Sequence, residues 1–391
     1  MRERTLLMKT IINRLAAMDY RSYDHYDFWG SPAGISLRRH RNAFTLPFIG
    51  AAYFADLAFP MLFRQRTAPA PPLETMPEIM RAMAAYCRLA RDDAFEKDRE
   101  RLLRGMLGHL GKTTHGVGVG HPFDWYTSTL IPAFTPCVPL SWNFAAYLLK
   151  EHPDGCRETL EGIGNFIYQD CNAEEIAGGG CRVSYTPLDR RWVVNANAAA
   201  ATALWRLGAH FGDAEWRGRG ERILAYVLAR QEEDGGFYYF ERGSVPDSEN
   251  FIDCFHSAFV LEHLMEWAAD GHAGAARAVE RALPWFAAAF AREDGSVRPF
   301  AVCHLPVTIV ADIRACAGVI SCFARANRFD PRYGKLAGRA LDYVLNNLYD
   351  GAGGFYFRKY RFFTSRMNYI RWGTAPMLGA LAAMAEEGVT A

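Results

Sequence analysis

Three side chains in the middle of the chain are of the types that proton transfer requires. Asp253 and His256 lie three residues apart, so on a helix they share one face and the carboxylate can orient or charge the imidazole. Tyr185 follows a glycine-rich turn and can donate or accept a proton if a neighbouring arginine lowers its pKa. Structural roles also stay open, because Asp253 suits a helix cap and His256 suits a buried hydrogen-bonding position.

Amide and guanidinium groups form a second set, suited to binding hydroxyls and carboxylates. Asn195 and Asn197 lie two residues apart where a helix is expected to begin, so one can cap the helix while the other faces a pocket. Arg314 and Arg371 each begin an otherwise apolar helix, where an unpaired guanidinium is unfavourable, so each needs an acidic partner. The candidates for that partner are Asp312 and Asp253.

The remaining candidates occupy equivalent places in a repeated pattern, after a glycine-rich turn. Aromatic rings there can stack on sugar rings, while polar side chains bind hydroxyl groups. Helix N-termini also present free N–H groups and the positive end of the helix dipole, which favours ligands such as sugar acids. The predicted substrate-binding residues of this kind are Asp124, Trp125, Tyr126, His304 and Trp372.

The glycine-rich turns recur along the chain at a nearly constant interval. The intervals are 63, 56, 60 and 56 residues, counted at Gly116, Gly179, Gly235, Gly295 and Gly351. Such an interval accommodates two helices and two turns of ordinary length. Helical periodicity is visible between the turns, for example over 198–211 and 216–231, whereas alternating β patterns are nearly absent.

These repeats predict an all-α fold: an (α/α) toroid of five or six helical hairpins, with short β-hairpin loops at one end. In a closed ring, each hairpin buries its apolar faces against its two neighbours. An open solenoid has the same period, but the helices here are apolar on more than one face and aromatic residues fill the turns. Because each polar stretch has the same place in its repeat, all of them are expected at one end of the ring.

Two regions are expected, separated by a proline-rich linker. Residues 1–72 are predicted to form an irregular N-terminal arm, and residues 73–391 the toroid domain. Within the arm, 44–63 is strongly apolar and flanked by arginines, but two prolines and an aspartate interrupt it. For this segment a buried hairpin or loop, an interfacial membrane contact and a membrane span all stay open.

Charge and cysteine content restrict the expected partners and compartment. The formal net charge of +1 provides no field to collect phosphates, so nucleic acid is not expected as a partner. The nine cysteines are odd in number and include no C-x-x-C pair, as expected for reduced thiols in the cytosol. No secretory signal is expected at the N-terminus. The predicted location is cytoplasmic, with peripheral contact at the inner face of the membrane as an open addition.

Several common catalytic signatures are missing from the sequence. It has no Walker loop, no G-x-G-x-x-G between a strand and a helix, no G-x-S-x-G elbow and no H-E-x-x-H pair. Cys254, next to Asp253 and His256, adds a third type of zinc ligand, but all three crowd one helical turn. We therefore expect neither a metal ion nor a cofactor.

A family resemblance is carried by six short stretches, at 162–167, 184–187, 194–197, 231–237, 252–256 and 369–372. Together they resemble bacterial exopolysaccharide- and capsule-biosynthesis proteins of the six-hairpin terpenoid-cyclase/prenyltransferase toroid superfamily. The resemblance covers about residues 110–380 and extends more weakly to 23–27. It implies the toroid fold and an association with polysaccharide assembly. It does not imply cyclisation or prenyl transfer, because the D-x-D-D acid and the D-x-C zinc pair are lacking.

The sequence favours an enzyme that acts on a uronic-acid-containing glycan or glycolipid intermediate, including a lipid-linked saccharide. Like an epimerase or lyase, it would remove the C5 proton, with Tyr185 and His256 as base and acid. One alternative is an inverting glycoside hydrolase with Asp124 and Asp253 as its carboxyl pair, about 6.5–9.5 Å apart. The other is a non-catalytic glycan-binding factor that works beside polysaccharide-assembly proteins.

Overall fold

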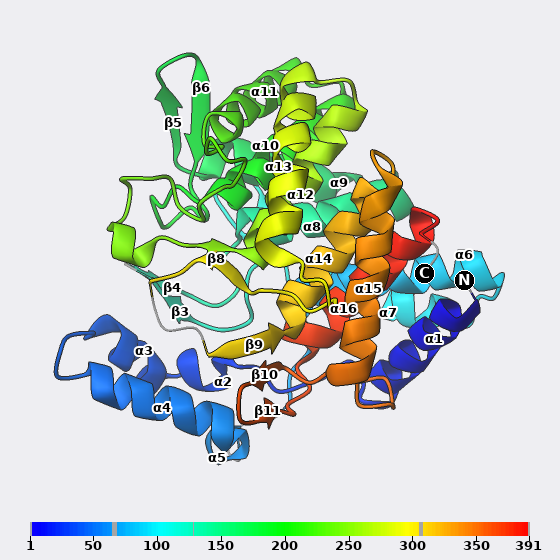
Figure 1. Cartoon of the computed structure of the whole chain (residues 1–391). Helices are drawn as coiled ribbons and strands as arrows, with labels where there is room; N and C mark the ends of the chain where they lie inside the picture. The colour runs from blue at the N-terminus through cyan, green and yellow to red at the C-terminus, as the bar shows by residue number, and fades with distance from the viewer. Residues whose placement is uncertain (1, 65–68, 128, 305–307, 390–391) are drawn as a thin grey trace.

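The computed structural model describes residues 2–64, 69–127, 129–304 and 308–389, and helices dominate it (Figure 1). In these residues the long helices form two concentric layers. The inner layer consists of α6 (Met76–Ala90), α8 (Val138–Glu151), α10 (Val194–Phe211), α12 (Cys254–Ala269), α14 (Ile313–Ala326) and α16 (Ala375–Glu386). The outer layer consists of α1 (Arg2–Ala17), α7 (Glu96–Gly108), α9 (Arg157–Asn165), α11 (Ala214–Leu228), α13 (Ala273–Phe290) and α15 (Pro331–Asn347).

The inner helices form a closed ring. Each contacts the next along the chain, from α6 through α8, α10, α12 and α14 to α16, and α16 returns to contact α6. One large hydrophobic core joins the two layers. The predicted all-α toroid is therefore confirmed, with six inner helices in the part of the chain that the structure describes.

Two of the glycine-rich turns follow outer helices and lie directly against the next outer helix. Gly235 and Gly295 have φ angles of +106° and +81°, a left-handed conformation that favours glycine. A side chain at Gly235 would also lie 2.7 Å from the backbone carbonyl of Arg281 in α13. Asp234 and Asp294 each accept a backbone N–H two residues further on, at 2.9 Å. The Asp-Gly pairs recur because each repeat needs this tight turn against the next outer helix.

Acidic caps determine where two of the inner helices begin. Asp253 accepts the backbone N–H of His256 at the start of α12, and Asp312 accepts the N–H groups of Arg314 and Ala315 at the start of α14. A π-helical turn, Ile370–Thr374, leads into α16. These starts place the polar stretches that precede the inner helices at one end of the ring, as predicted.

The strands are short antiparallel pairs in the connections between helices. Two-stranded pairs are formed by β1 (Gly111–Lys112) with β2 (Val117–Gly118), β3 (Trp125–Tyr126) with β4 (Leu130–Ile131), β5 (Ala173–Ile176) with β6 (Gly180–Val183), and β7 (Ile252–Asp253) with β8 (Phe300–Val302). A three-stranded sheet has the order β11 (Thr364–Ser365), β10 (Arg358–Tyr360), β9 (Ile309–Asp312).

The first 72 residues are more regular than the irregular arm that we expected. The helix α1 packs against α6 and α16, and its Met8, Ile11 and Ile12 are fully buried. These apolar residues follow helical spacing, so α1 completes the outer layer rather than forming an arm. The toroid therefore includes residues 2–17 in addition to those from 73 onward.

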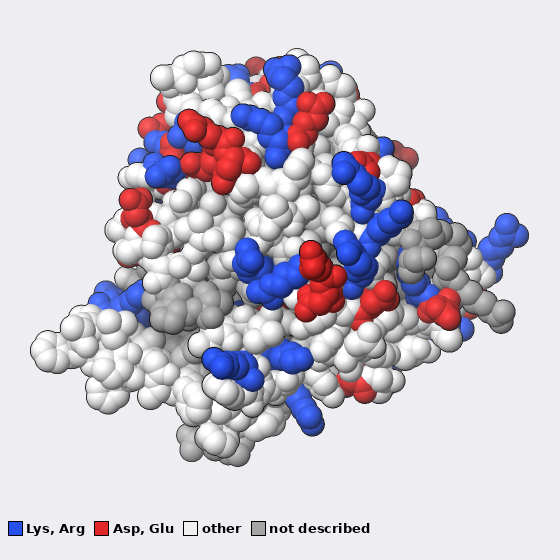
Figure 2. Space-filling model, in the orientation of Figure 1, with Lys and Arg blue, Asp and Glu red and all other residues white. Residues whose placement is uncertain are grey.

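Residues 26–64 form a separate lobe of four short helices beside the ring, at the lower left of Figure 1. They are α2 (Tyr26–Trp29), α3 (Pro32–Arg39), α4 (Leu46–Ala58) and α5 (Pro60–Arg64). Asp56, which interrupts the apolar segment, is buried and contacts His25 at 2.7 Å and Arg64 at 2.6 Å. The outer surface of the lobe carries few charged side chains (Figure 2). Of the helices that the structure describes, none is long and apolar enough to cross a membrane.

Candidate active site

A cavity of about 470 Å³ follows the axis of the ring, and all six inner helices line it. On α14 the lining extends from Arg314 to Arg325, eleven helical steps or about 16.5 Å at 1.5 Å per residue. We call the end where the inner helices begin the mouth, and the opposite end the base. The cavity is therefore long enough to hold more than one sugar unit.

The structure brings most of the predicted site residues together at the mouth. Those that line the cavity are Trp125, Tyr185, Asn195, His256, Arg314, Arg371 and Trp372. Asp253 lies behind His256 and lines a small adjoining pocket. Asn195 is 5% exposed, and its Oδ1 has no hydrogen-bond partner among the described residues, so it can accept a ligand hydroxyl.

Besides Asp253, four predicted site residues do not line the cavity. Asp124 accepts a backbone N–H that follows β4, at 2.8 Å, and so fixes the hairpin whose strand β3 carries Tyr126. Asn197 is fully buried, and its amide makes three hydrogen bonds to backbone atoms. His304 is exposed. Because Asp124 is held in this way, the structure does not support the hydrolase that pairs it with Asp253.

His256 lies in the first turn of α12, and its ring is held by the aspartate that caps the helix. Asp253 accepts the backbone N–H of His256 at 2.9 Å and contacts the ring Nδ1 at 2.7 Å. Burial disfavours the charged form of Asp253, but the imidazole outweighs this effect and lowers the pKa of the carboxyl below its ordinary value. A carboxylate at Nδ1 keeps a proton there and leaves Nε2 to exchange one with a ligand.

A second imidazole at the mouth is arranged in the same way. Nδ1 of His121 lies 3.1 Å from Oε1 of Glu74, whose side chain is 2% exposed. Sequence analysis did not single out this pair. His121 stands first in the polar stretch after the first glycine-rich turn, which was a usable signal. Glu74 had none, because it lies 47 residues away and only the tertiary fold places it beside the ring.

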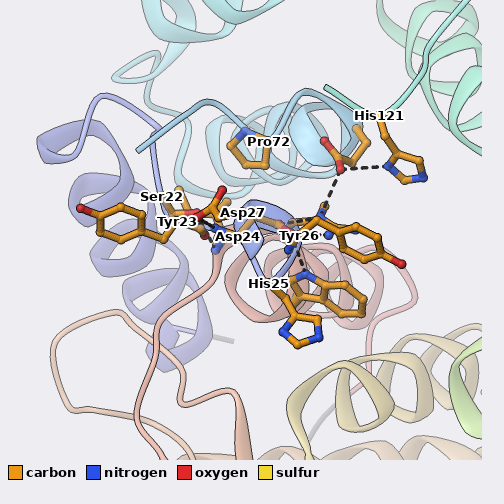
Figure 3. A network of polar contacts seen from close by, with 12 residues as sticks. Ser22, Tyr23, Asp24, His25, Tyr26, Asp27, Pro72 and His121 are labelled. Carbon is orange, nitrogen blue, oxygen red and sulfur yellow. Dashed lines mark hydrogen bonds and ion pairs between the residues drawn. The ribbon is translucent and has the colours of Figure 1, made fainter. Parts of the chain in front are cut away.

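Arg371 is held by carboxylates from the N-terminal part of the chain (Figure 3). Its Nε and Nη2 donate to the two carboxylate oxygens of Asp24, at 2.6 and 2.5 Å. Its Nε also lies 3.2 Å from Oε1 of Glu74, so Figure 3 shows one continuous polar network from Asp24 to His121. The segment that contains Asp24 therefore forms part of the site, although the sequence analysis placed no site residue in it.

The partners that the sequence proposed for the two arginines are engaged elsewhere. Asp312 contacts Nε of Arg358 at 2.5 Å, and Asp253 is occupied by His256. The prediction that one of them pairs with Arg371 or Arg314 was therefore wrong. Each of these carboxylates caps a helix and is also bound by another side chain, Asp312 by Arg358 and Asp253 by His256.

Arg314 has no hydrogen bond or ion pair from its guanidinium to any residue that the structure describes. The group lies between two rings, 4.0 Å from the centre of Phe255 and 4.5 Å from that of Trp372. Burial lowers its pKa below the ordinary arginine value, although Asp312 and Asp253 oppose the shift. An anionic ligand at the mouth would supply the missing counter-charge, and a carboxylate matches the guanidinium geometry.

Aromatic side chains form the walls of the mouth. Trp125 meets Tyr185 edge-on, with the ring centres 5.8 Å apart. Tyr26 stacks on Phe123 at 4.7 Å and lies parallel to Trp372 at 6.4 Å. Walls of this kind bind the apolar faces of sugar rings and leave polar groups to fix their orientation.

Tyr185 is placed in the cavity as predicted, but its surroundings do not suit a base. Burial raises the pKa of its phenol well above the ordinary value, and the neighbouring Cys137 and Tyr239 raise it further. No arginine is among the groups that shift it, contrary to the condition set by the sequence interpretation. Tyr185 therefore stays protonated near neutral pH and can donate a hydrogen bond to a ligand.

Deeper in the cavity, two ionisable groups are buried with incomplete hydrogen bonding. Glu78 lies one turn beyond Glu74, and burial raises its pKa to about 7. Burial lowers the pKa of His263 to about 4. Oε2 of Glu78 and Nδ1 of His263 have no partner within the described ranges. Near neutral pH, His263 is therefore uncharged and Glu78 is partly protonated, and both side chains can bind hydroxyl groups.

The Glu78→Gln variant is expected to be less sensitive to rising pH than the wild type. The folded pKa of Glu78, about 7, lies above the ordinary value of 4.5, so between these values the folded state keeps a proton that the unfolded chain has lost. Wild-type stability therefore falls as the pH rises through this window, by on the order of 1–3 kcal/mol.

Urea unfolding at about pH 5 and about pH 8 measures this effect as the change in the difference between the two proteins. Glu280→Gln, on the exposed side of α13, is the matched control and should follow the wild type at both pH values. If Glu78→Gln also follows the wild type, the pKa of Glu78 is not raised in the folded protein.

No group of three or more His, Cys, Asp or Glu side chains in the described residues is arranged to hold a metal ion. All nine cysteines are free thiols.

Comparison with known proteins relates this chain to others through structure. No family model and no curated protein sequence matches it. A cellobiose 2-epimerase from Bacillus thermoamylovorans is 12% identical with a TM-score of 0.61, over 82% of this chain and 88% of that chain. A possible GH105-family member from Salmonella enterica is 9% identical with a TM-score of 0.62, over 98% and 93%.

A third similar structure is an ent-copalyl diphosphate synthase from Streptomyces platensis. It is 18% identical with a TM-score of 0.51, over 87% of this chain but only 55% of that chain. At such identities the likeness concerns the fold, and the link to exopolysaccharide or capsule assembly stays a prediction. The chain is therefore a six-hairpin (α/α) toroid, an architecture that it shares with a cellobiose 2-epimerase and a terpene cyclase.

Proposed function

We propose that this protein is a carbohydrate-active enzyme that removes the C5 proton of a uronic acid unit in a glycan or glycolipid. One observation carries the proposal: two carboxylate-supported imidazoles, His256 and His121, line the same cavity beside Arg314, which has no ion pair with the described residues. Imidazoles are the side chains used most often for proton transfer, and a guanidinium matches the geometry of a uronate carboxylate.

The two imidazoles come from opposite walls of the ring. His256 is on α12, and His121 is bound to Glu74, which directly precedes α6. In a ring of six helices in the order α6, α8, α10, α12, α14, α16, the helices α6 and α12 face each other. A sugar bound between them would present its two faces to different imidazoles, as inversion of a carbon centre requires.

The reaction begins with the uronate carboxylate against Arg314. The unprotonated Nε2 of one imidazole takes the C5 proton, and the C–H electron pair enters the C5–C6 bond, which generates an enediolate. Arg314 stabilises the second negative charge on the carboxylate oxygens, and the phenol of Tyr185 can donate to a sugar oxygen. Each supporting carboxylate stabilises the imidazolium that forms.

Two products can follow from this intermediate. In epimerisation, the opposite imidazolium returns a proton to the other face of C5. In elimination, the electron pair forms a C4–C5 double bond, the bond from C4 to its oxygen substituent breaks, and an imidazolium protonates the leaving oxygen. The opposed imidazoles favour epimerisation, and the fold shared with a cellobiose 2-epimerase supports the same choice.

The proposal is tested by NMR in D₂O with a panel of uronic-acid oligosaccharides. Loss of the H5 signal shows proton abstraction, a signal from the other C5 configuration shows epimerisation, and ultraviolet absorbance from an unsaturated product shows elimination. A ligand that binds without any H5 exchange would refute the proposal. If new reducing ends appear instead, the protein is a glycoside hydrolase, for which Glu78 with its raised pKa is the candidate general acid.

The Tyr185→Phe variant is expected to keep H5 exchange within about tenfold of the wild type, because only one hydrogen-bond donor to the ligand is lost. A phenol with a raised pKa cannot serve as the base near neutral pH. Initial rates of H5 loss at saturating oligosaccharide measure the effect. If the rate falls as far as it does in a His256→Ala variant, Tyr185 takes part in proton transfer after all.

A further inference from the structure

An exposed apolar surface lies on the lobe formed by residues 26–64. Its aromatic side chains are largely exposed to solvent: Phe44 is 87% exposed, Phe48 69% and Phe54 61%. We call this surface the α4 face, and its members are Phe44, Leu46, Phe48, Phe54, Phe59 and Met61. Large apolar patches on soluble surfaces mark places where another apolar phase or partner binds.

The charges around the α4 face have one sign. From Phe28 to Leu73 the chain contains a single acidic residue, Asp56, which is buried and paired with Arg64. Arg39 and Arg41 are exposed just before the apolar segment. Figure 2 shows the lobe as a largely uncharged protrusion with basic side chains at its edge. The surface therefore combines exposed rings with positive charge and presents no carboxylate of its own.

The lobe is attached directly to the mouth of the cavity. On α2, Tyr26 lines the cavity, and its hydroxyl accepts a hydrogen bond from Arg38 of α3 at 3.3 Å. On α4, the hydroxyl of Tyr53 accepts one from Arg358 of β10 at 2.9 Å. A body that covers the α4 face would therefore lie next to the mouth.

We propose that the α4 face docks on an anionic lipid bilayer. The rings enter the boundary between headgroups and acyl chains, and Arg39 and Arg41 bind lipid phosphates at its edge. A second copy of the chain fits this surface less well, because a symmetric contact would bring the same arginines together without an opposing acid. The charge pattern thus selects a negatively charged apolar phase over self-association.

Docking has a consequence for the substrate, and this step rests on the proposed function. With the α4 face in the membrane, the mouth lies beside the headgroups, where a saccharide attached to a lipid presents its sugar. The inferred substrate is therefore a uronic acid unit carried on a lipid. A soluble oligosaccharide would be a slower alternative that needs no membrane.

Docking is tested by co-sedimentation of the full chain with vesicles of phosphatidylcholine alone and of phosphatidylcholine with phosphatidylglycerol. We expect binding to the anionic vesicles and little to the neutral ones. Raising the ionic strength from about 0.1 M to about 1 M shortens the Debye length from about 10 Å to about 3 Å and should weaken the binding.

Two double variants separate the apolar from the electrostatic contribution. Phe48→Ser with Phe54→Ser should reduce the partition coefficient by about tenfold or more, because two exposed rings no longer enter the bilayer. Arg39→Gln with Arg41→Gln should reduce binding to anionic vesicles only. All four side chains are exposed, and circular dichroism with thermal unfolding checks that the variants stay folded.

The controls carry the same substitutions elsewhere on the surface. Phe329→Ser replaces a ring that is 43% exposed after the C-terminal end of α14, at the opposite end of the ring from the mouth. Lys335→Gln with Arg339→Gln removes two exposed cations from α15. Both controls should bind vesicles as the wild type does.

The proposal is overturned if the protein binds neither kind of vesicle, or if the controls lose as much binding as the α4-face variants. It is also overturned if sedimentation velocity shows a dimer that the Phe48 and Phe54 substitutions dissociate while vesicles stay unbound. Vesicle binding and H5 exchange on soluble oligosaccharides are measured separately, so a failure of docking is distinguishable from a failure of the proposed function.

Discussion

Replacement of His256 by alanine is expected to lower the rate of H5 exchange by about 10²–10⁴-fold in uronates whose C5 proton faces this imidazole, the usual range for loss of a general acid or base. The variant keeps Asp253 and the backbone N–H that it caps, so α12 should begin as before. The cavity also keeps its arginines and aromatic walls, so ligand binding should change little. The effect is therefore expected on the chemical step and not on affinity.

The His121→Ala variant is the counterpart of this experiment. If the two imidazoles act on opposite faces of C5, either variant should abolish epimerisation. Each should still exchange H5 in substrates of one C5 configuration, because the remaining imidazole takes and returns the proton on its own face. The two variants should therefore retain exchange with opposite configurations.

NMR in D₂O with uronic acids of both C5 configurations measures these rates, and titration calorimetry measures affinity. His109→Ala is the matched control, because this histidine is exposed at the end of the outer helix α7 and lies outside the cavity. Loss of exchange with the same configuration in both variants would rule out opposed acid–base groups. Full activity in both variants would remove the imidazoles from the mechanism.

Replacement of Arg371 by methionine is expected to lower the free energy of unfolding by about 3–5 kcal/mol, as happens when a buried ion pair loses one member. The change leaves the half-buried Asp24 and the buried Glu74 without their common cation. It also detaches the segment around Asp24, which places Tyr26 in the wall of the cavity. Urea unfolding followed by circular dichroism measures the loss.

Arg314→Met is the matched substitution on the same wall, with a different expected outcome. Since this guanidinium has no ion pair with the described residues, its removal leaves no carboxylate unpaired, and stability should be unchanged or higher. Binding of a uronate should instead weaken by about 1.5–3 kcal/mol, the value of a hydrogen bond to a charged group. Binding of the corresponding neutral sugar should not change.

The two arginine variants check each other. If Arg314→Met destabilises the protein as much as Arg371→Met does, Arg314 has a structural partner and is not the carboxylate-binding group. If the variant binds the uronate and the neutral sugar more weakly by the same factor, Arg314 supports the shape of the mouth and does not recognise charge. Titration calorimetry with both sugars separates these outcomes.

Local pattern was enough to predict several features of this protein. The Asp-Gly turns recur because the same tight, left-handed turn is needed in each repeat, and their interval therefore shows the helical hairpins. The pairing of Asp253 with His256 needed no more than the spacing of three residues in a helix. Asn195 lines the cavity, but the expectation that the other asparagine caps the helix was wrong: no side chain caps α10, and Asn197 bonds backbone atoms of Val183 and Val193.

Other features depended on contacts between distant parts of the chain, which no local pattern contains. Asp24 pairs with Arg371 across 347 residues, and only closure of the ring brings them together. The burial of a side chain could not be predicted from local sequence either. Tyr185 lies in the cavity as expected, but its burial there raises the pKa of the phenol. The periodicity of a sequence predicts where a helix forms and which of its faces is apolar. Ion pairing and desolvation depend instead on which helices become neighbours. The repeats, the helices and the end of the ring where the polar residues gather therefore follow from local sequence, whereas the ion pairs among those residues and their positions in the cavity depend on the tertiary contacts.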